Sequence, residues 1–284
     1  MNPFVSPAET SAHVRALRQL QLAEVPFVVG GAYAMFHYTG VVRYTKDLDV
    51  FLRREDEARA REVLARAGFR TLVQDPLWLS KAFWADTFVD LIYSSGNGVA
   101  GVDDAWLAHA PAGDVLGVKT KIVPPEEMIW SKAYVQERER WDGADVAHLV
   151  RSCGHAVDWP RLLGRFGEHW HVLLAHLVLF SFSYPHDRDA VPKWVWRLLL
   201  AKARRLEQDE GQDGKLCRGT LLSRTQYLPD LGLWGYRDAR EVEVPGFIAP
   251  EAELHAPLFA RRPDPEADER GSPTLDAEAL AQEV

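Results

Sequence analysis

Two aspartates, one residue apart, interrupt an apolar run in the segment GVVRYTKDLDVFLRRE of residues 40–55. The alternation around them predicts a strand, on which Asp47 and Asp49 point to one face while Leu48 and Val50 point to the other. Two like charges side by side repel each other and resist burial. A chain that places this strand in a folded sheet must therefore supply something that neutralises the pair.

A short apolar run that ends in two glycines, PFVVGG, precedes this strand. We expect a strand there, a tight turn at Gly30 and Gly31, and a short helix that ends at Gly40. Free backbone N–H groups and the positive helix end at such a turn suit a phosphate group, and glycine lets the anion approach the backbone. A plain strand-to-helix turn is the alternative interpretation.

A third aspartate, Asp90, interrupts the apolar segment FVDLIY, where a carboxylate is costly unless a cation accompanies it. A solvent-facing position on an edge strand is the alternative. Three carboxylates on adjacent strands make an oxygen-rich site, which suits Mg²⁺ better than Zn²⁺. The two cysteines, Cys153 and Cys217, lie far apart and fit neither a zinc site nor a disulfide framework.

Hydrophobic periodicity predicts an α/β N-terminal half and a mostly helical C-terminal half. Helices are expected over residues 9–24 and 55–68, and further strands in FRTLV, LSKAFWADT and FVDLIYSSG. Paired prolines at 124 and 125 open the helical half, which extends to about residue 206. The aromatic segment of residues 218–240 is ambiguous, although its composition predicts that it packs onto another part of the protein.

Charge and hydropathy exclude some classes of partner. The formal net charge of −8 gives no global attraction for nucleic acid or anionic membranes, although it leaves room for a local basic groove. The longest apolar stretch, residues 172–182, is too short to span a bilayer and is expected to be a core helix. The first residues lack the basic start and apolar core of a signal peptide. We therefore expect a cytoplasmic protein with neither a membrane nor a DNA partner.

The glycine pair, Asp47-Leu48-Asp49 and Asp90 resemble, in order and spacing, the signature of the DNA polymerase beta superfamily of nucleotidyltransferases. The resemblance covers about residues 10–150. It looks most like the small prokaryotic branch, which includes aminoglycoside and lincosamide adenylyltransferases and the nucleotidyltransferase toxins of type IV toxin–antitoxin systems. It implies an α+β nucleotidyltransferase fold, with a mixed β-sheet flanked by helices. Gly31 replaces a serine that many members carry, so a phosphate contact from that hydroxyl would be absent.

The resemblance implies a magnesium-dependent reaction, in which a nucleoside monophosphate passes from an NTP to an acceptor hydroxyl and pyrophosphate leaves. Asp47, Asp49 and Asp90 would be the catalytic residues and would bind two Mg²⁺ ions. Asp90 would in addition accept the proton of the acceptor hydroxyl.

The phosphates of the NTP would lie against the glycine turn and two basic residues. The backbone at Gly30 and Gly31 would contact them, together with Arg43, which stands just before the aspartate pair and fits phosphate in a bidentate manner. Lys132, on the helix after the sheet, occupies a place comparable to that of a lysine that reaches the triphosphate in some relatives. A solvent-facing lysine is the alternative for Lys132.

Four segments follow from these expectations: residues 1–124 as the catalytic domain, 125–206 as a helical region that closes the nucleotide site, 207–248 as an ordered extension, and 249–284 as a disordered acidic tail. The acceptor stays open between a small molecule, a tRNA and a protein. The alternative function is a nucleotide-binding or partner-binding protein that retains the fold without catalysis. A structural α/β module is a further alternative, and it predicts that Asp90 lies far from the other two aspartates.

Overall fold

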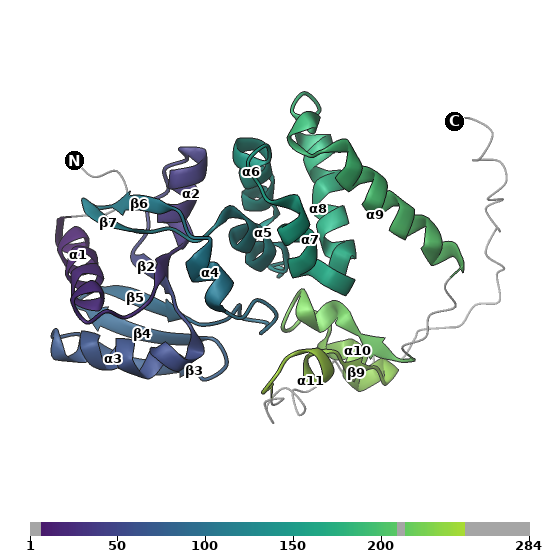
Figure 1. Cartoon of the computed structure of the whole chain (residues 1–284). Coiled ribbons are helices and arrows are strands. Elements are labelled where there is room, and N and C mark those ends of the chain that lie inside the picture. Colours follow the sequence, from purple (N-terminus) through teal and green to yellow (C-terminus); the bar gives the residue numbers. More distant parts are fainter. Residues whose placement is uncertain (1–6, 209–213, 248–284) are drawn as a thin grey trace.

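The protein, described by a computed structural model over residues 7–208 and 214–247, is built around a five-stranded sheet (Figure 1). Its strands are β1 (Val28–Val29), β2 (Asp47–Phe51), β3 (Arg70–Asp75), β4 (Leu79–Trp84) and β5 (Thr87–Ile92), in the order β1-β2-β5-β4-β3. The neighbours β2 and β5 are parallel and the other pairs are antiparallel, so the sheet is mixed. The expected α+β architecture is confirmed, whereas the predicted tail of residues 249–284 lies outside the described residues.

Helices cover both faces of this sheet. The helices α1 (Pro7–Leu22) and α3 (Glu57–Arg66) pack on the face to which the buried side chains of Leu48, Val89 and Leu91 point. Because side chains alternate along a strand, the three aspartates point to the opposite face. On that side lie α2 (Gly31–Thr39) and α4 (Asp104–Ala108).

A hairpin of β6 (Ala112–Val115) and β7 (Val118–Lys121) was not predicted from the sequence. Its turn residues, Leu116 and Gly117, both have positive φ angles, of 55° and 79°. Asparagine or aspartate followed by glycine is the strong sequence signal for this kind of turn, and leucine at the first position hides it.

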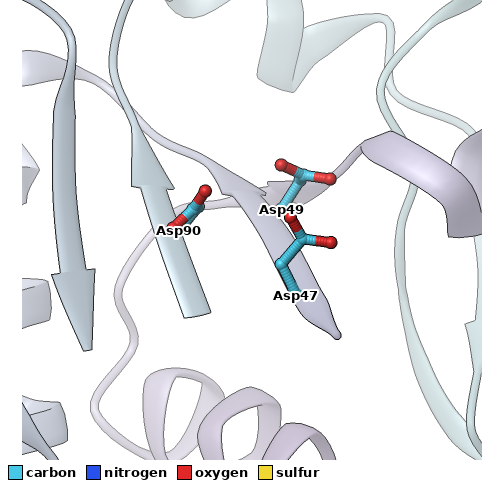
Figure 2. A group of neighbouring side chains, drawn as sticks. All are labelled: Asp47, Asp49 and Asp90. Atoms are coloured by element: carbon cyan, nitrogen blue, oxygen red, sulfur yellow. The ribbon is translucent and has the colours of Figure 1, made fainter. Parts of the chain in front are cut away.

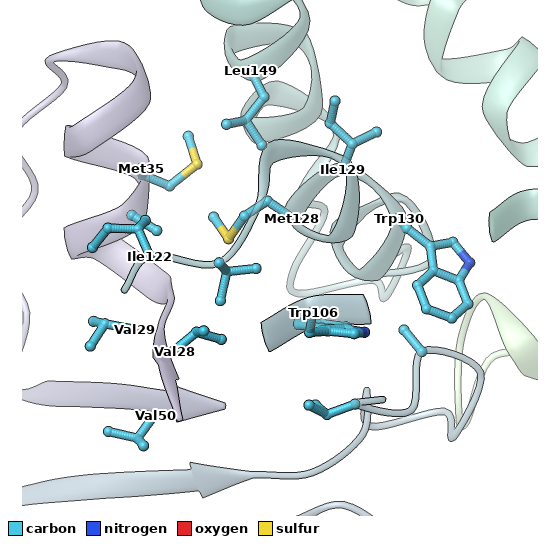
Figure 3. Packing of buried hydrophobic residues seen from close by; sticks show 14 of the residues in the cluster. Val28, Val29, Met35, Val50, Trp106, Ile122, Met128, Ile129, Trp130 and Leu149 are labelled. Carbon is cyan, nitrogen blue, oxygen red and sulfur yellow. The ribbon is translucent and has the colours of Figure 1, made fainter. Parts of the chain in front are cut away.

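Five helices follow the sheet in Figure 1: α5 (Pro125–Ala133), α6 (Gly143–Cys153), α7 (Trp159–Phe166), α8 (Trp170–Ser183) and α9 (Lys193–Arg205). The hydrophobic core continues from the sheet into them, since Val50, Met35, Met128 and Leu149 belong to one cluster (Figure 3). The predicted boundary between residues 124 and 125 stays a prediction. Among the described residues, none of the helices is long and apolar enough to cross a bilayer.

The ambiguous aromatic segment forms a small unit of β8 (Leu216–Cys217), α10 (Leu228–Trp234), β9 (Arg237–Asp238) and α11 (Arg240–Glu243). The strands β8 and β9 pair in parallel. Short 3₁₀ turns complete the described structure at Arg54–Asp56, Gly167–His169, Arg188–Ala190, Leu206–Gln208 and Arg218–Leu221. The last of these turns and the residues after it contact the loop that follows β5 and the residues that follow α5. This segment contributes to the site described next.

Candidate active site

Three carboxylates from two neighbouring strands meet at one point of the sheet (Figure 2). Asp47 and Asp49 lie on β2, and the parallel register of β2 and β5 places Asp90 opposite Asp49. One carboxylate oxygen from each of the three residues lies within 4.8 Å of the others. The structure therefore brings the three predicted residues together, and the alternative in which Asp90 lies far from the pair is wrong.

This crowding changes the proton affinity of the carboxylates. Burial and, after it, the nearby charges of Asp47 and Asp90 together raise the pKa of Asp49 to about 7. Burial also raises the pKa of Asp90, although its bond with Lys81 opposes the shift. Three carboxylates at this separation repel one another, and their hard oxygen atoms are the ligands that Mg²⁺ prefers. The donor set therefore fits the expected divalent cation.

Lys81 is a part of the site that was not predicted from the sequence. It lies on β4 opposite Asp90, and its Nζ donates a hydrogen bond to Asp90 Oδ1 at 2.6 Å. The same ammonium group lies 4.0 Å from the ring centre of Phe88. A lysine within the apolar strand LSKAFW is the signal that could have identified it, because a cation in such a run needs an anionic partner.

The glycine turn packs directly against the carboxylates. The N–H of Gly30 donates to the carbonyl of Asp49 at 2.9 Å, and Gly31 begins α2 with a φ of +54°. A Cβ atom at Gly31 would lie 1.6 Å from Oδ2 of Asp49. A residue with a side chain at this position would therefore require the Asp49 side chain to move.

The two basic residues expected to bind phosphate lie at the same cleft but contact protein carboxylates. The Nζ of Lys132 lies 2.9 Å from Asp142 and 2.7 Å from Asp145, and Nη1 of Arg43 lies 2.5 Å from Asp145. With 15 % of its side chain exposed, Lys132 is not the solvent-facing lysine of the alternative. Arg140 also pairs with Asp142, at 3.0 Å. Acidic residues therefore hold these basic side chains at the cleft, and the binding of phosphate by Arg43 and Lys132 stays a prediction.

The carboxylates and these ion pairs line one cleft of about 750 Å³. Its charged lining residues include the three aspartates, Arg43, Lys132, Arg140, Asp142 and Asp145. The lining also includes Phe51, Trp78, Ile92, Ser94, Ser95, Asn97, Tyr134, Val135, Leu222, Arg224 and Thr225. Three of these residues belong to the C-terminal segment, whose contribution was not predicted.

Hydrogen bonds hold the C-terminal segment of residues 221–225 at the cleft. The N–H of Gln136, just after α5, donates to the carbonyl of Leu222 at 3.1 Å, and the side-chain amide of Asn97, after β5, donates to the carbonyl of Leu221. Glu137 accepts the N–H of Arg224 at 3.0 Å. The segment therefore joins the sheet side of the cleft to its helical side.

Comparisons with known proteins identify a family and several similar solved structures. A family model described as "Nucleotidyl transferase of unknown function (DUF2204)" matches residues 9–158. Among solved structures, the antibiotic-resistance factor ANT(2'')-Ia shares 18% identity with this chain at a TM-score of 0.44, over 61% of this chain and 98% of that one. The lincosamide antibiotic adenylyltransferase LnuA shares 12% identity at a TM-score of 0.37, over 51% of this chain and 97% of that one. JHP933 from Helicobacter pylori shares 14% identity at a TM-score of 0.35, over 72% of this chain and 98% of that one. No curated protein matches the sequence.

Proposed function

The chain belongs to the nucleotidyl transferase family DUF2204, and on this premise we propose that it transfers a nucleoside monophosphate from an NTP to a hydroxyl group. The observation that carries the proposal is the meeting of Asp47, Asp49 and Asp90 within 4.8 Å, on the floor of a cleft large enough for a nucleotide. A protein without catalysis has no evident use for three carboxylates crowded together at one point of the sheet.

Asp47, Asp49 and Asp90 would hold the two Mg²⁺ ions of the proposed reaction. When bound, Mg²⁺ supplies positive charge that stabilises the transferring phosphoryl group and the oxygens that enter and leave it. Lys81 orients Asp90 through its bond to Oδ1. A carboxylate with a raised pKa is a stronger base once ionised, so Asp90 is suited to accept a proton.

In the proposed step, the oxygen of the acceptor hydroxyl forms a bond to the α-phosphorus, while the bond from that phosphorus to the bridging oxygen of the β-phosphate breaks. Pyrophosphate leaves with the electron pair of the broken bond, and Asp90 takes the hydroxyl proton. The acceptor must therefore reach the side of the carboxylate cluster that β5 forms.

The triphosphate would compete with protein carboxylates for the basic side chains of the cleft. Lys132 pairs with Asp142 and Asp145, and Arg43 pairs with Asp145. A triphosphate carries more negative charge than either aspartate, and guanidinium binds phosphate through two parallel bonds. We expect Lys132 and Arg43 to bind the phosphates, with the backbone at Gly31 at the N-terminus of α2.

The test is transfer of radioactive label from each α-³²P-labelled NTP, with Mg²⁺, to total tRNA, to proteins of a cell lysate and to a panel of small hydroxyl compounds. The matched control is the Asp47→Ala/Asp49→Ala variant, checked for folding by circular dichroism. Label transferred by the wild type alone supports the proposal and identifies the acceptor class. Mg²⁺-dependent NTP binding without transfer to any of these acceptors favours the alternative, a nucleotide-binding protein. An absence of NTP binding contradicts both.

A further inference from the structure

A chain of buried polar groups lies beneath the first of the three aspartates. His13 of α1 is fully buried, and its ring contacts the hydroxyl of Tyr33 through Nδ1 at 3.0 Å and that of Thr87 through Nε2 at 3.2 Å. The hydroxyl of Thr87, at the start of β5, also donates to the backbone carbonyl of Lys46 at 2.7 Å. Lys46 immediately precedes Asp47, so this chain of bonds ends at the peptide group that joins Lys46 to a predicted metal ligand.

The donors and acceptors in this chain can be assigned from their number of protons. Thr87 has one hydroxyl proton, and the carbonyl of Lys46 can only accept, so that proton points to Lys46. The Nε2 of His13 must then carry a proton and donate it to Thr87. A neutral imidazole has one donor and one acceptor, so Nδ1 accepts from the hydroxyl of Tyr33. Burial lowers the pKa of His13, which agrees with a neutral ring.

Asp47 needs support of this kind because of where it lies. It is the first residue of β2, and residues 40–46 before it, all of them described, form neither helix nor strand. The charges of Asp49 and Asp90 repel its carboxylate. The bond between Thr87 and Lys46 ties this end of β2 to β5, and the hydroxyl of Thr45 contacts the Asp47 carboxylate directly.

We propose that Thr87, oriented by His13, is a positioning residue that holds Asp47 in place as a ligand of the divalent cation. The inference rests on the proposed function, because it requires the three carboxylates to bind a cation. Groups that orient a metal ligand typically change metal affinity about 10- to 100-fold when they are removed. A role confined to folding would instead lower stability and leave the affinity of the folded protein unchanged.

The experiment measures Mn²⁺ binding to the nucleotide-free, full-length protein by electron paramagnetic resonance, with the unfolding temperature of each variant alongside. Thr87→Val keeps the shape and removes both hydrogen bonds, whereas Thr87→Ser keeps the hydroxyl. Thr220→Val is the matched control, because Thr220 is also fully buried and donates to a backbone carbonyl, that of Cys217 at 3.1 Å. We expect Thr87→Val to weaken Mn²⁺ binding about tenfold, and the other two variants to bind within about twofold of the wild type.

Two results overturn the inference while leaving the proposed function intact. In the first, Thr87→Val unfolds at a lower temperature but binds Mn²⁺ as the wild type does. In the second, Thr87→Ser binds as weakly as Thr87→Val, which would show that the hydroxyl is not what matters. If the wild type itself binds no Mn²⁺, both the inference and the proposed metal site fail. The wild-type measurement therefore separates the two kinds of failure.

Discussion

Replacement of Gly31 by alanine tests the close packing of the glycine turn against the carboxylates. The φ of +54° costs a residue with a side chain about 1–2 kcal/mol. In addition, the new methyl group would lie 1.6 Å from Oδ2 and 2.6 Å from Cγ of Asp49, so that this side chain must turn away. Overpacking of this kind costs about 1–3 kcal/mol. We expect Gly31→Ala to lower the free energy of unfolding by about 2–5 kcal/mol in total.

Gly40 provides a control that separates the two contributions. It has a φ of +70° at the end of α2, and a Cβ there would meet no described atom within 4 Å. Gly40→Ala should therefore lose only the backbone part, about 1–2 kcal/mol. Urea unfolding of the full-length protein without metal ions measures both variants, and the difference between them reports the contact with Asp49.

A second measurement links the contact to the site. Because Asp49 must move, Gly31→Ala should also weaken Mn²⁺ binding, whereas Gly40→Ala should bind as the wild type does. In the double variant Gly31→Ala/Asp49→Ala the two closest clashing atoms are gone, so the loss of stability should be smaller than the sum of the single losses. The reasoning is refuted if Gly31→Ala loses no more stability than Gly40→Ala and retains wild-type Mn²⁺ affinity.

Three further predictions follow from the charges of the site. Because the pKa of Asp49 rises from 3.8 to about 7 on folding, its contribution to stability is present below pH 4 and is lost as the pH rises through 7. Mg²⁺ binds the ionised carboxylate, so thermal unfolding should show a larger Mg²⁺-induced stabilisation at pH 8 than at pH 6, and an equal effect at both would count against this. Lys81→Met removes the bond that opposes the raised pKa of Asp90, so the acid limb of the pH–rate profile should move to higher pH. Lys132→Met should weaken NTP binding about tenfold or more in a fluorescent-nucleotide titration and leave Mn²⁺ binding intact, and unchanged NTP affinity would remove Lys132 from the phosphate site.

The sequence contained strong local signals for the sheet and its carboxylates. Alternation of apolar residues predicted β2, and a short apolar run predicted β5. A charge is costly in either segment unless the fold compensates it. Asp47, Asp49 and Asp90 each stand out for this reason. Their meeting at one point depends on the order of the strands, which came from the resemblance to a family and not from the periodicity.

Other parts of the site depend on contacts that no local pattern encodes. The pairing of Lys81 with Asp90 is set by the register between β4 and β5. The binding of Lys132 by Asp145 requires α5 and α6 to pack side by side, which depends on the tertiary structure. The segment around Leu222 reaches the cleft through hydrogen bonds to residues more than eighty positions earlier in the chain. Such partners cannot be matched without the fold.

The segment around Leu222 is synthesised on the ribosome later than the other residues of the site. The two strands that carry the three aspartates are synthesised first, whereas Leu221, Leu222 and Arg224 follow them. Until this segment emerges, Gln136 and Asn97 lack the carbonyl groups that they bind in the finished structure. A nascent chain thus has its carboxylates before it has this segment, and a product truncated before residue 221 would lack Leu222, Arg224 and Thr225 from the lining of the cleft.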